Sequence, residues 1–280
     1  PAASFEEYTL TLTDGEQSVT LQHLLIGEVW LCAGQSNMVM PLNGFDYCPI
    51  SDSNNVIADA PNHPGIRMVT IKPTVKLSPQ EYAEGSWQQP TTENAPKFSA
   101  AAYHYALTLQ RTLQIPIGVI TCAWGGSRVE GWLPKEILQT YKDEDLTLIG
   151  SDKTPVYLQS MLMYNGILYP CHKYTIKGFI WYQGESNVRS SRTYAERLAT
   201  MVKHWRSIWK QGDLPFYYVE TVPFACEYKE DGYIGALLRE AQQKALSLIP
   251  NSGMIGTNDL VETYEAPQVH PHNKKGIGER

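Results

Sequence analysis

The period of hydrophobic and polar positions changes near residue 27. Residues 5–26 alternate apolar and polar side chains around Asp14-Gly15, a pattern that predicts a β-hairpin. Beyond residue 27, short continuous apolar runs alternate with longer segments whose apolar positions recur every three or four residues. The pattern therefore predicts two antiparallel strands, followed by strands that alternate with helices.

Six short apolar runs are typical of strands that are buried on both faces. They lie at 27–33, 66–71, 117–123, 176–183, 214–220 and 253–257. The clearest amphipathic helices are expected at 99–113, 193–210 and 236–248. Apolar strands that alternate with amphipathic helices indicate a mostly parallel sheet with helices on both faces.

Glycine and polar residues follow four of the predicted strands. The segments are GQSNM (34–38), WGGSRVEGW (124–132), GESN (184–187) and NDLVETYEAPQVHPHNKKG (258–276). Ligands of parallel sheets bind beyond the carboxyl ends of the strands, so we expect a site where these segments meet. The segment 41–65, rich in Pro, Asn, Asp and Gly, is expected to form an irregular loop over the same edge.

Charge and composition exclude several classes of partner. The 280 residues carry a formal net charge of -6, and no dense run of Lys and Arg offers a surface for nucleic acid or anionic membranes. The longest apolar runs are much shorter than the roughly 20 residues that span a bilayer. We therefore expect no nucleic-acid partner and no membrane insertion.

The cysteines indicate neither a disulfide framework nor a zinc ribbon, because their number is odd and no CxxC pair occurs. The five are Cys32, Cys48, Cys122, Cys171 and Cys226. Cys32 and Cys122 fall in predicted strands and are expected to be buried.

Three serines at predicted strand ends, Ser36, Ser127 and Ser186, are candidates for a nucleophile. None lies in a GxSxG sequence, so the nucleophile elbow of the α/β-hydrolases is not supported. Of the seven histidines, His270 stands apart because it follows the last strand and precedes a helix-like segment. His270 and His272 lack a third clustered ligand, so no metal site is expected.

Five segments together point to one protein family. They are GEVWLCAGQSNM, WGGSRVEGW, KGFIWYQGESN, LREAQ and VHPHNKKGIGER, and they span nearly the whole chain from about residue 25. In this order they resemble the sialate O-acetylesterase family of the SGNH (GDSL-like) hydrolases, which is related to the acetylxylan esterases. The combination of GQSNM with WYQGESN makes the resemblance highly specific.

The resemblance implies a three-layer α/β/α, flavodoxin-like fold with a parallel sheet of about five strands. Residues 26–280 would form the SGNH hydrolase catalytic domain. Residues 1–25 would be a β-hairpin extension, either a simple addition or the remnant of an N-terminal β-rich domain.

The same resemblance assigns the central chemistry. It makes Ser36 the nucleophile and His270 the general base. The backbone N–H groups of Ser36 and of a glycine in Gly125-Gly126, with Gly126 preferred, would stabilise the oxyanion. Tight backbone geometry alone is the other reason for that glycine pair.

A side-chain amide is expected as a further oxyanion donor. Gln183, at the end of its strand, is preferred over Asn187. Gln35 and Asn37, which flank Ser36, are expected to support the site. Glu185 either orients the site by accepting hydrogen bonds or pairs with an arginine.

The acid of the triad is in doubt. SGNH hydrolases carry an Asp three residues before the histidine, whereas this chain has Pro267 there. The acid is either absent, leaving a Ser–His dyad, or replaced by a backbone carbonyl near 266–268, or supplied by another carboxylate. The candidates are Glu265, Glu262 and Asp259.

Two residues are candidates for substrate contact. Arg128 either binds a sugar-acid carboxylate or has a surface role. Trp124 either stacks on a sugar ring or belongs to the core.

The function implied is hydrolysis of acetyl esters on a carbohydrate, first of all an O-acetylated sialic acid (9-O-acetylated), through an acetyl-enzyme and without a cofactor. The alternatives are an acetylxylan or other plant-polysaccharide acetylesterase and a carbohydrate-binding relative that has lost turnover. Glycan substrates suggest a periplasmic or secreted protein by analogy. The oligomeric state is not indicated by the sequence.

Overall fold

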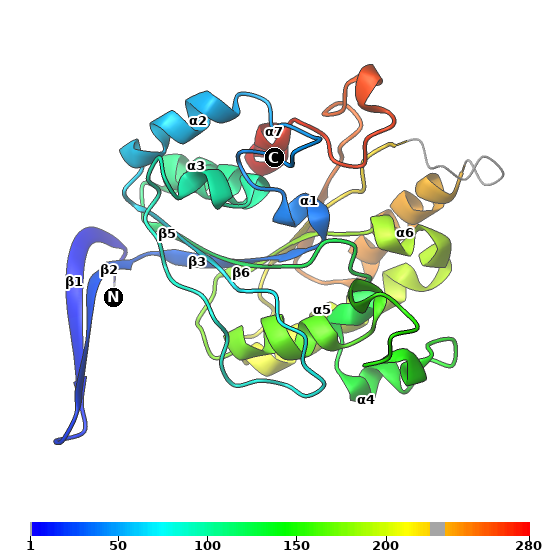
Figure 1. Cartoon of the computed structure of the whole chain (residues 1–280), viewed down its shortest axis with the longest axis horizontal. Coiled ribbons are helices and arrows are strands. Elements are labelled where there is room, and N and C mark those ends of the chain that lie inside the picture. Colours follow the sequence, from blue (N-terminus) through cyan, green and yellow to red (C-terminus); the bar gives the residue numbers. More distant parts are fainter. Residues whose placement is uncertain (1, 225–232) are drawn as a thin grey trace.

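A single parallel sheet forms the middle layer of the protein. The computed structural model describes residues 2–224 and 233–280, and in these residues the sheet has six strands in the order β4-β5-β3-β6-β7-β8 (Figure 1). The strands are β3 (Glu28–Gly34), β4 (Ile66–Thr70), β5 (Ile117–Ala123), β6 (Gly178–Tyr182), β7 (Phe216–Val219) and β8 (Ser252–Ile255). The predicted strands are confirmed, with six in the sheet instead of about five.

Helices cover both faces of this sheet. One face carries α1 (Ser36–Val39), α2 (Ser53–Asp59), α3 (Ala100–Leu113) and α7 (Lys274–Glu279), and the other carries α4 (Lys135–Leu138), α5 (Ser191–Trp209) and α6 (Ile234–Leu248) (Figure 1). The three predicted amphipathic helices are confirmed as α3, α5 and α6. The fold is the three-layer α/β/α arrangement expected from the sequence.

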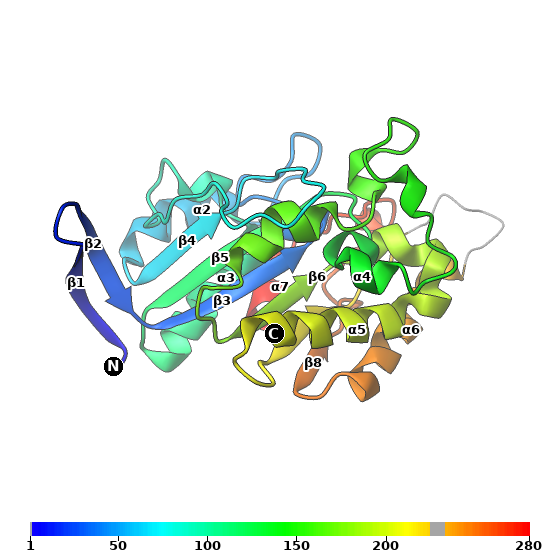
Figure 2. The same cartoon turned by 90° about the horizontal axis from the view of Figure 1, so that it is seen from below.

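Alternate residues of the central strand β3 face the two cores. Leu31 and Ala33 pack with α5 and α6, whereas Trp30 and Cys32 pack with α1 and α3. Figure 2 shows β4, β5, β3 and β6 side by side in this order. Because β3 is buried on both sides, its sequence is continuously apolar rather than alternating.

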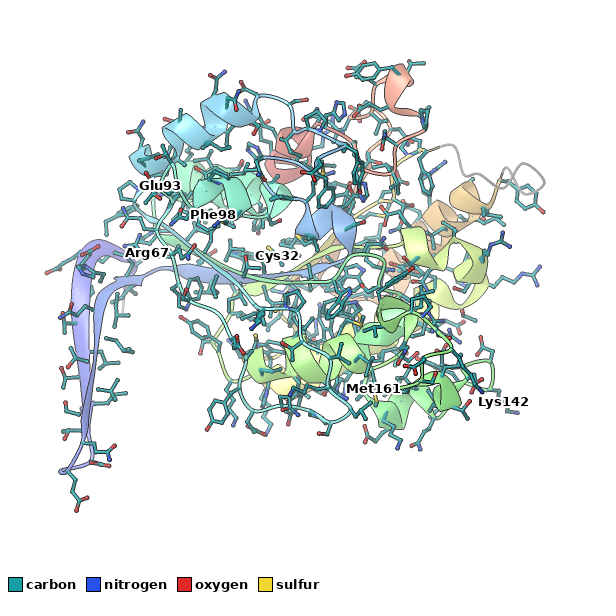
Figure 3. The ribbon with its side chains drawn as sticks, viewed as in Figure 1. Cys32, Arg67, Glu93, Phe98, Lys142 and Met161 are labelled. Atoms are coloured by element: carbon teal, nitrogen blue, oxygen red, sulfur yellow. The ribbon has the colours of Figure 1, made fainter. Side chains whose placement is uncertain are left out.

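The cysteines of the predicted strands are buried, as expected. Cys32 lies in β3, within the sheet layer (Figure 3), and Cys122 lies in β5. Cys48 and Cys171 are buried as well, and Cys226 lies outside the described residues.

The N-terminal hairpin projects away from the α/β body. β1 (Ser4–Thr13) pairs antiparallel with β2 (Ser18–Ile26), and the arm extends well beyond the helices in Figure 1. Nearly all of its residues are exposed, including the apolar side chains of Leu10, Leu12 and Val19. The predicted hairpin is confirmed.

The prediction of an irregular loop over 41–65 is wrong in its second half. Ser53–Asp59 form α2, and Ala60–Asn62 form a short 3-10 helix. Val56, Ile57 and Ala60 pack against the core beside α3, and this tertiary contact outweighs the turn-forming composition of the segment. None of the helices in the described part of the chain is long and apolar enough to cross a membrane.

Candidate active site

Ser36 lies at the carboxyl end of the central strand, as the first residue of α1. Gly34, with a φ of +145°, ends β3 beside β6, where a Cβ atom would come 2.1 Å from the Tyr182 carbonyl oxygen. Only glycine permits this approach. The next residue, Gln35, donates its backbone N–H to the same oxygen at 3.0 Å. The chain then turns into α1, which leaves Ser36 partly exposed.

The side chain of Gln35 ties the Ser36 turn to the segment after β6. Its Oε1 accepts hydrogen bonds from the backbone N–H groups of Gly184 at 3.1 Å and Ser186 at 3.3 Å. Ser186 in turn donates its hydroxyl to the Gly126 carbonyl at 2.8 Å. The ends of β3, β5 and β6 are thus joined by hydrogen bonds, as expected for residues that follow neighbouring parallel strands.

The glycine pair after β5 lies beside Ser36. A Cβ atom on Gly125 would be 3.7 Å from the Ser36 Cβ, and Gly126 has a φ of +74°. In the described residues, neither the Ser36 N–H nor the Gly126 N–H is donated to a backbone or side-chain acceptor. Both are therefore available to an oxyanion formed at Ser36.

Gln183 is buried in a set of hydrogen bonds within the protein. Its Nε2 donates to the Ser127 carbonyl at 3.0 Å and to Asn187 Oδ1 at 2.8 Å, while its Oε1 accepts from the Tyr194 hydroxyl at 2.9 Å. Both amide hydrogens are in use. As an oxyanion donor, Gln183 would have to give up one of these bonds.

Asn187, the other amide considered, is also fully engaged. Its Nδ2 donates to Glu130 Oε2 at 3.0 Å and to Ser190 Oγ at 3.3 Å, and its Oδ1 accepts from the Val129 N–H at 2.9 Å. The two amides brace the segments after β5 and β6 against each other. The backbone N–H groups near Ser36 are the freer donors.

His270 lies on the loop between β8 and α7, with its ring edge against Phe45 at a centroid distance of 5.2 Å. Only 7% of the residue is exposed, and neither ring nitrogen has a hydrogen-bond partner among the described residues. Burial and the nearby charge of Lys274 lower the pKa of His270 to about 4. The imidazole is therefore neutral near pH 7 and able to accept a proton.

The structure brings the neighbours of Ser36 and His270 into direct contact. Asn37 Nδ2 donates to the Val269 carbonyl at 2.9 Å. Because both ring nitrogens of His270 are unpartnered, the ring is not hydrogen-bonded to Ser36 in this structure. Catalytic hydrogen bonds are often formed only once substrate is bound.

The candidate acids do not reach the His270 ring. Glu265 accepts from the backbone N–H groups of Glu262 at 2.8 Å and His272 at 2.7 Å, and so fixes the loop. Its nearest imidazole is that of His272, at 3.5 Å. Asp259 pairs with Arg280 at 2.7 Å. No carboxylate of the described residues therefore hydrogen-bonds the His270 ring as a triad acid would.

Glu185 accepts a hydrogen bond from Asn37 Nδ2 at 2.7 Å, which is the first of its two expected roles. Burial raises the pKa of its carboxyl group, and Oε2 is buried without a hydrogen-bond partner in the described residues. Lys274, which the sequence reading did not single out, donates to Asn37 Oδ1 at 2.7 Å and is fully buried. A signal existed, because Lys274 shares a helix face with the buried Ile277 and Gly278.

Arg128 is held by an acidic neighbour. Its guanidinium donates to Glu144 Oε1 at 2.7 Å and to the Leu158 carbonyl at 3.0 Å. Trp124 is partly buried and packs against the core on the α5 side. Neither the Arg128 nor the Trp124 side chain is therefore free to contact a sugar.

Two exposed tyrosines border the site instead. The Tyr157 ring would lie 2.7 Å from a Cβ atom on Gly126, and 41% of this residue is exposed. Tyr47 stacks on Phe45 at 5.8 Å between ring centroids. Neither was predicted, because both lie in irregular segments without a motif.

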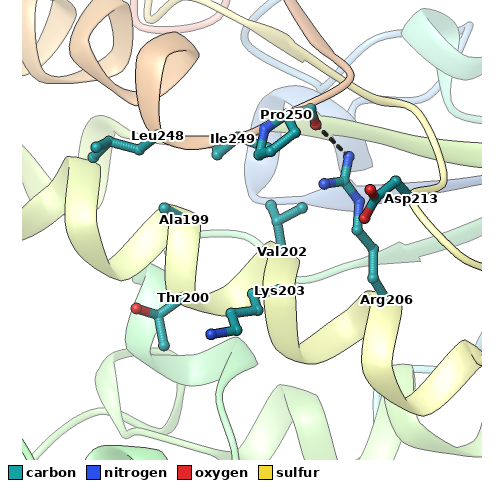
Figure 4. Close-up of a pocket in the computed structure, with 9 residues that line it drawn as sticks. All are labelled: Ala199, Thr200, Val202, Lys203, Arg206, Asp213, Leu248, Ile249 and Pro250. Carbon is teal, nitrogen blue, oxygen red and sulfur yellow. Dashed lines mark hydrogen bonds between the residues drawn. The ribbon is translucent and has the colours of Figure 1, made fainter.

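A separate pocket of about 310 Å³ lies between α5 and the segment that leads into β8 (Figure 4). Its wall includes Arg206 in the last turn of α5 and Pro250 just before β8, and Arg206 donates to the Pro250 carbonyl at 2.7 Å. Residues that precede a strand mark the amino edge of a parallel sheet, whereas Ser36 follows the carboxyl end of β3. The pocket contains none of the predicted site residues.

Comparisons with known proteins agree with the fold. Residues 26–280 match the family described as carbohydrate esterase, sialic acid-specific acetylesterase. The chain is 25% identical over 287 residues to the sialate O-acetylesterase of Homo sapiens, an alignment that covers 94% of this chain and 53% of that protein. The corresponding protein of Mus musculus is 25% identical over 319 residues, covering 96% and 58%. The chain thus spans little more than half the length of these relatives.

A solved structure gives the same result. A carbohydrate acetylesterase from Xanthomonas citri is 30% identical with a TM-score of 0.84, and the match covers 99% of this chain and 59% of that one. Together with the match over residues 26–280, this means that the chain belongs to the family of carbohydrate esterases described as sialic acid-specific acetylesterases.

Proposed function

We propose that this chain hydrolyses acetyl esters on carbohydrates, with Ser36 as nucleophile and His270 as general base. The observation that carries the proposal is that a partly exposed serine at the end of the central strand and a buried, neutral and unpartnered histidine each lie next to one partner of the Asn37–Val269 hydrogen bond. Buried ring nitrogens without partners are costly, and a proton-transfer role explains why they are kept.

The proposed steps are those of a serine esterase. A ring nitrogen of His270 takes the hydroxyl proton of Ser36 as the oxygen attacks the acetyl carbonyl carbon. The N–H groups of Ser36 and Gly126 bind the oxyanion, and the imidazolium returns the proton to the departing sugar oxygen. Water then attacks the acetyl-enzyme in the same way and releases acetate. The mechanism needs no metal or cofactor, and loss of one oxyanion donor typically costs about 3–4 kcal/mol.

O-Acetylated sialic acid is the first substrate to test, because the curated relatives are named sialate O-acetylesterases. The exposed Tyr47 and Tyr157 supply aromatic surface for a sugar ring beside the reacting group. A glycan substrate also favours a periplasmic or secreted location.

An acetylated neutral polysaccharide such as xylan is the second candidate. Its support is the pairing of Arg128 with Glu144, which leaves this guanidinium without a free face for the carboxylate of a sialic acid. The two candidates share the reaction and differ in the sugar.

The test is acetate release from 9-O-acetylated sialic acid and from acetylated xylan by the wild type, Ser36→Ala and Ser207→Ala. Ser207 is exposed on α5 and serves as the matched control. We expect turnover by the wild type and the control and a loss of at least about 10³-fold in Ser36→Ala. The ratio of the two rates identifies the sugar. Full activity of Ser36→Ala, or no release by the wild type even from a small activated acetate, would refute the proposal.

A further inference from the structure

The backbone around His270 is held by three buried side chains. The carbonyl oxygens of residues 269–271 accept hydrogen bonds, in chain order, from Asn37 Nδ2, Cys48 Sγ and Lys274 Nζ, each at 2.9 Å. The donors come from α1, from the loop that follows α1 and from the start of α7. Three separate segments therefore converge on one tripeptide.

Lys274 connects this tripeptide to the nucleophile's own helix. Its Nζ donates to Asn37 Oδ1 at 2.7 Å as well as to the Pro271 carbonyl, and it lies 5.6 Å from the centre of the Tyr182 ring. Asn37 Nδ2 donates in turn to Glu185 Oε1. All polar atoms of the Asn37 amide are thereby used, and an ammonium and a carboxyl group are linked through it.

A buried ammonium group is costly. Lys274 is completely buried, and an apolar side chain of similar length would fill the same space without a desolvation penalty. Packing alone therefore gives no reason for a lysine at this position. The hydrogen bonds of Lys274 to Asn37 and to the Pro271 carbonyl supply such a reason, because both partners hold the backbone around His270.

We propose that Lys274, Asn37 and Cys48 form a clamp that positions His270 toward Ser36 and takes over the orienting role of the acid that Pro267 replaces. The inference rests on the proposed roles of Ser36 and His270. In an ordinary triad the acid holds the imidazole through a ring nitrogen. In this chain the clamp holds the backbone before, at and after the histidine, and the ring packs against Phe45.

The charge of Lys274 also acts on the imidazole. It adds to burial in lowering the pKa of His270, which keeps the base unprotonated. Burial lowers the pKa of Lys274 itself to about 7, while the carboxyl groups of Glu185 and Glu265 and the thiol of Cys48 favour its charged form. Removal of the ammonium should therefore make His270 easier to protonate.

The main test compares Lys274→Met with Lys275→Met. Lys275 is the next residue of α7, but it is exposed and lies 3.9 Å from Glu279, so it is a matched control. The readouts are the pKa of His270 from an NMR titration, with His270→Gln to assign its signal, and the pH profile of kcat/KM on a small activated acetate.

In Lys274→Met we expect the pKa of His270 and the acid limb of the profile to rise by about one pH unit. We also expect kcat to fall about 10²-fold with KM nearly unchanged, because a misplaced base slows the chemical step. A purely structural lysine would lower the amount of folded protein and leave both pH values where they are. Identical pH values in Lys274→Met and Lys275→Met would overturn the clamp.

A second pair of variants covers the case in which Lys274→Met does not fold. Cys48→Ser keeps a donor to the His270 carbonyl and Cys48→Ala removes it. We expect kcat of Cys48→Ala to be about three- to tenfold below that of Cys48→Ser. Equal kcat values in this pair would overturn the clamp.

The two proposals fail in different ways. If the wild type hydrolyses no acetyl ester but the NMR titration still shows the shift in Lys274→Met, the clamp stands and the proposed function fails. If the wild type is active and neither the titration nor the pH profile changes, the function stands and the clamp fails.

Discussion

Gly34 allows the end of β3, just before the candidate nucleophile, to approach the backbone of the neighbouring strand β6 closely. Its φ of +145° and the 2.1 Å between an added Cβ and the Tyr182 carbonyl oxygen leave no room for any side chain. The obstacle is backbone of β6, which cannot move without disturbing the sheet. One residue thus sets both the end of β3 and the start of the Ser36 turn.

We predict that Gly34→Ala lowers the free energy of unfolding by at least about 3 kcal/mol, because a backbone clash adds to an unfavourable φ. Urea unfolding measures the loss. Gly212→Ala is the control, since Gly212 also has a positive φ (+79°) but nothing within 4 Å of an added Cβ, and it should cost about 1–2 kcal/mol. Equal losses in the two variants would contradict a clash at Gly34.

At the residue scale, the sequence reading located the residues that follow strand ends but not their partners. The positions of Ser36, Gly126 and His270 could be predicted because each lies in a segment that follows an apolar run. The hydrogen bond from Gln183 to the Ser127 carbonyl could not be predicted, since partners far apart in sequence leave no local pattern.

Lys274 is the clearest omission of that reading. A lysine among polar residues usually marks a solvated helix face, so its place on the same helix face as Ile277 and Gly278 was not used as a signal. The docking of α7 on α3 buries Lys274, whereas Lys275 is exposed one position later.

At the element scale, the packing of α3 against α7 buries a titratable group. The Cβ of His104 lies 2.5 Å from the position of a Cβ on Gly278, and only 3% of His104 is exposed. Burial, with smaller contributions from Lys275 and Arg111, lowers the pKa of His104 to about 4. Asp52 acts in the opposite direction.

This buried histidine makes the stability depend on pH. Between pH 6.5 and 4 the unfolded chain binds a proton at His104 and the folded chain does not, so acidification through this range favours unfolding. We predict that, from pH 7 to pH 5, the wild type loses about 2 kcal/mol more unfolding free energy than His104→Phe. Chemical denaturation at both pH values measures the difference.

The same acid loss in His104→Phe as in the wild type would mean that His104 is protonated in the folded protein near pH 5.

Elements were predictable where one face or both faces are uniformly apolar. The helix expected at 99–113 corresponds to α3, whose first turn is capped by Ser99 accepting from the Ala102 N–H at 3.3 Å. α2 was missed because its Asn and Asp residues favour turns, and the short α4 and the π-helix Tyr164–Leu168 are too brief to show a period.

At the scale of the whole molecule, the hairpin extends away from the α/β body (Figure 1). A two-stranded sheet is marginally stable on its own, and β1 pairs only with β2 among the described residues. The hypothesis that residues 1–25 are the remnant of a further β-rich domain stays a prediction. Exposed Leu10, Leu12 and Val19 are the kind of side chains that such a neighbour would cover.

We predict that limited proteolysis of the full chain cuts within Ser4–Ile26 before it cuts any strand of the six-stranded sheet, because exposed backbone with few tertiary contacts opens most easily. Mass spectrometry of the early fragments locates the first cuts. A first cut inside β3, β5 or β6 would show that the α/β body opens more easily than the arm.

The order of the strands was beyond the reach of the sequence. The alternation of strands and helices indicates a parallel sheet, but nothing in the apolar runs says that β3 lies between β5 and β6. That position decides which segments meet at Ser36, so the site could be predicted only as a set of strand ends.

The central place of β3 also bears on how the chain folds. Its two partners, Ile117–Ala123 and Gly178–Tyr182, follow it only after long intervening segments. Loop-closure entropy must be overcome before either pairing contributes, so sheets of this topology form slowly. During synthesis, the strand that ends just before the candidate nucleophile therefore keeps both edges unpaired until Ile117–Ala123 has been made, and one edge unpaired until Gly178–Tyr182 follows.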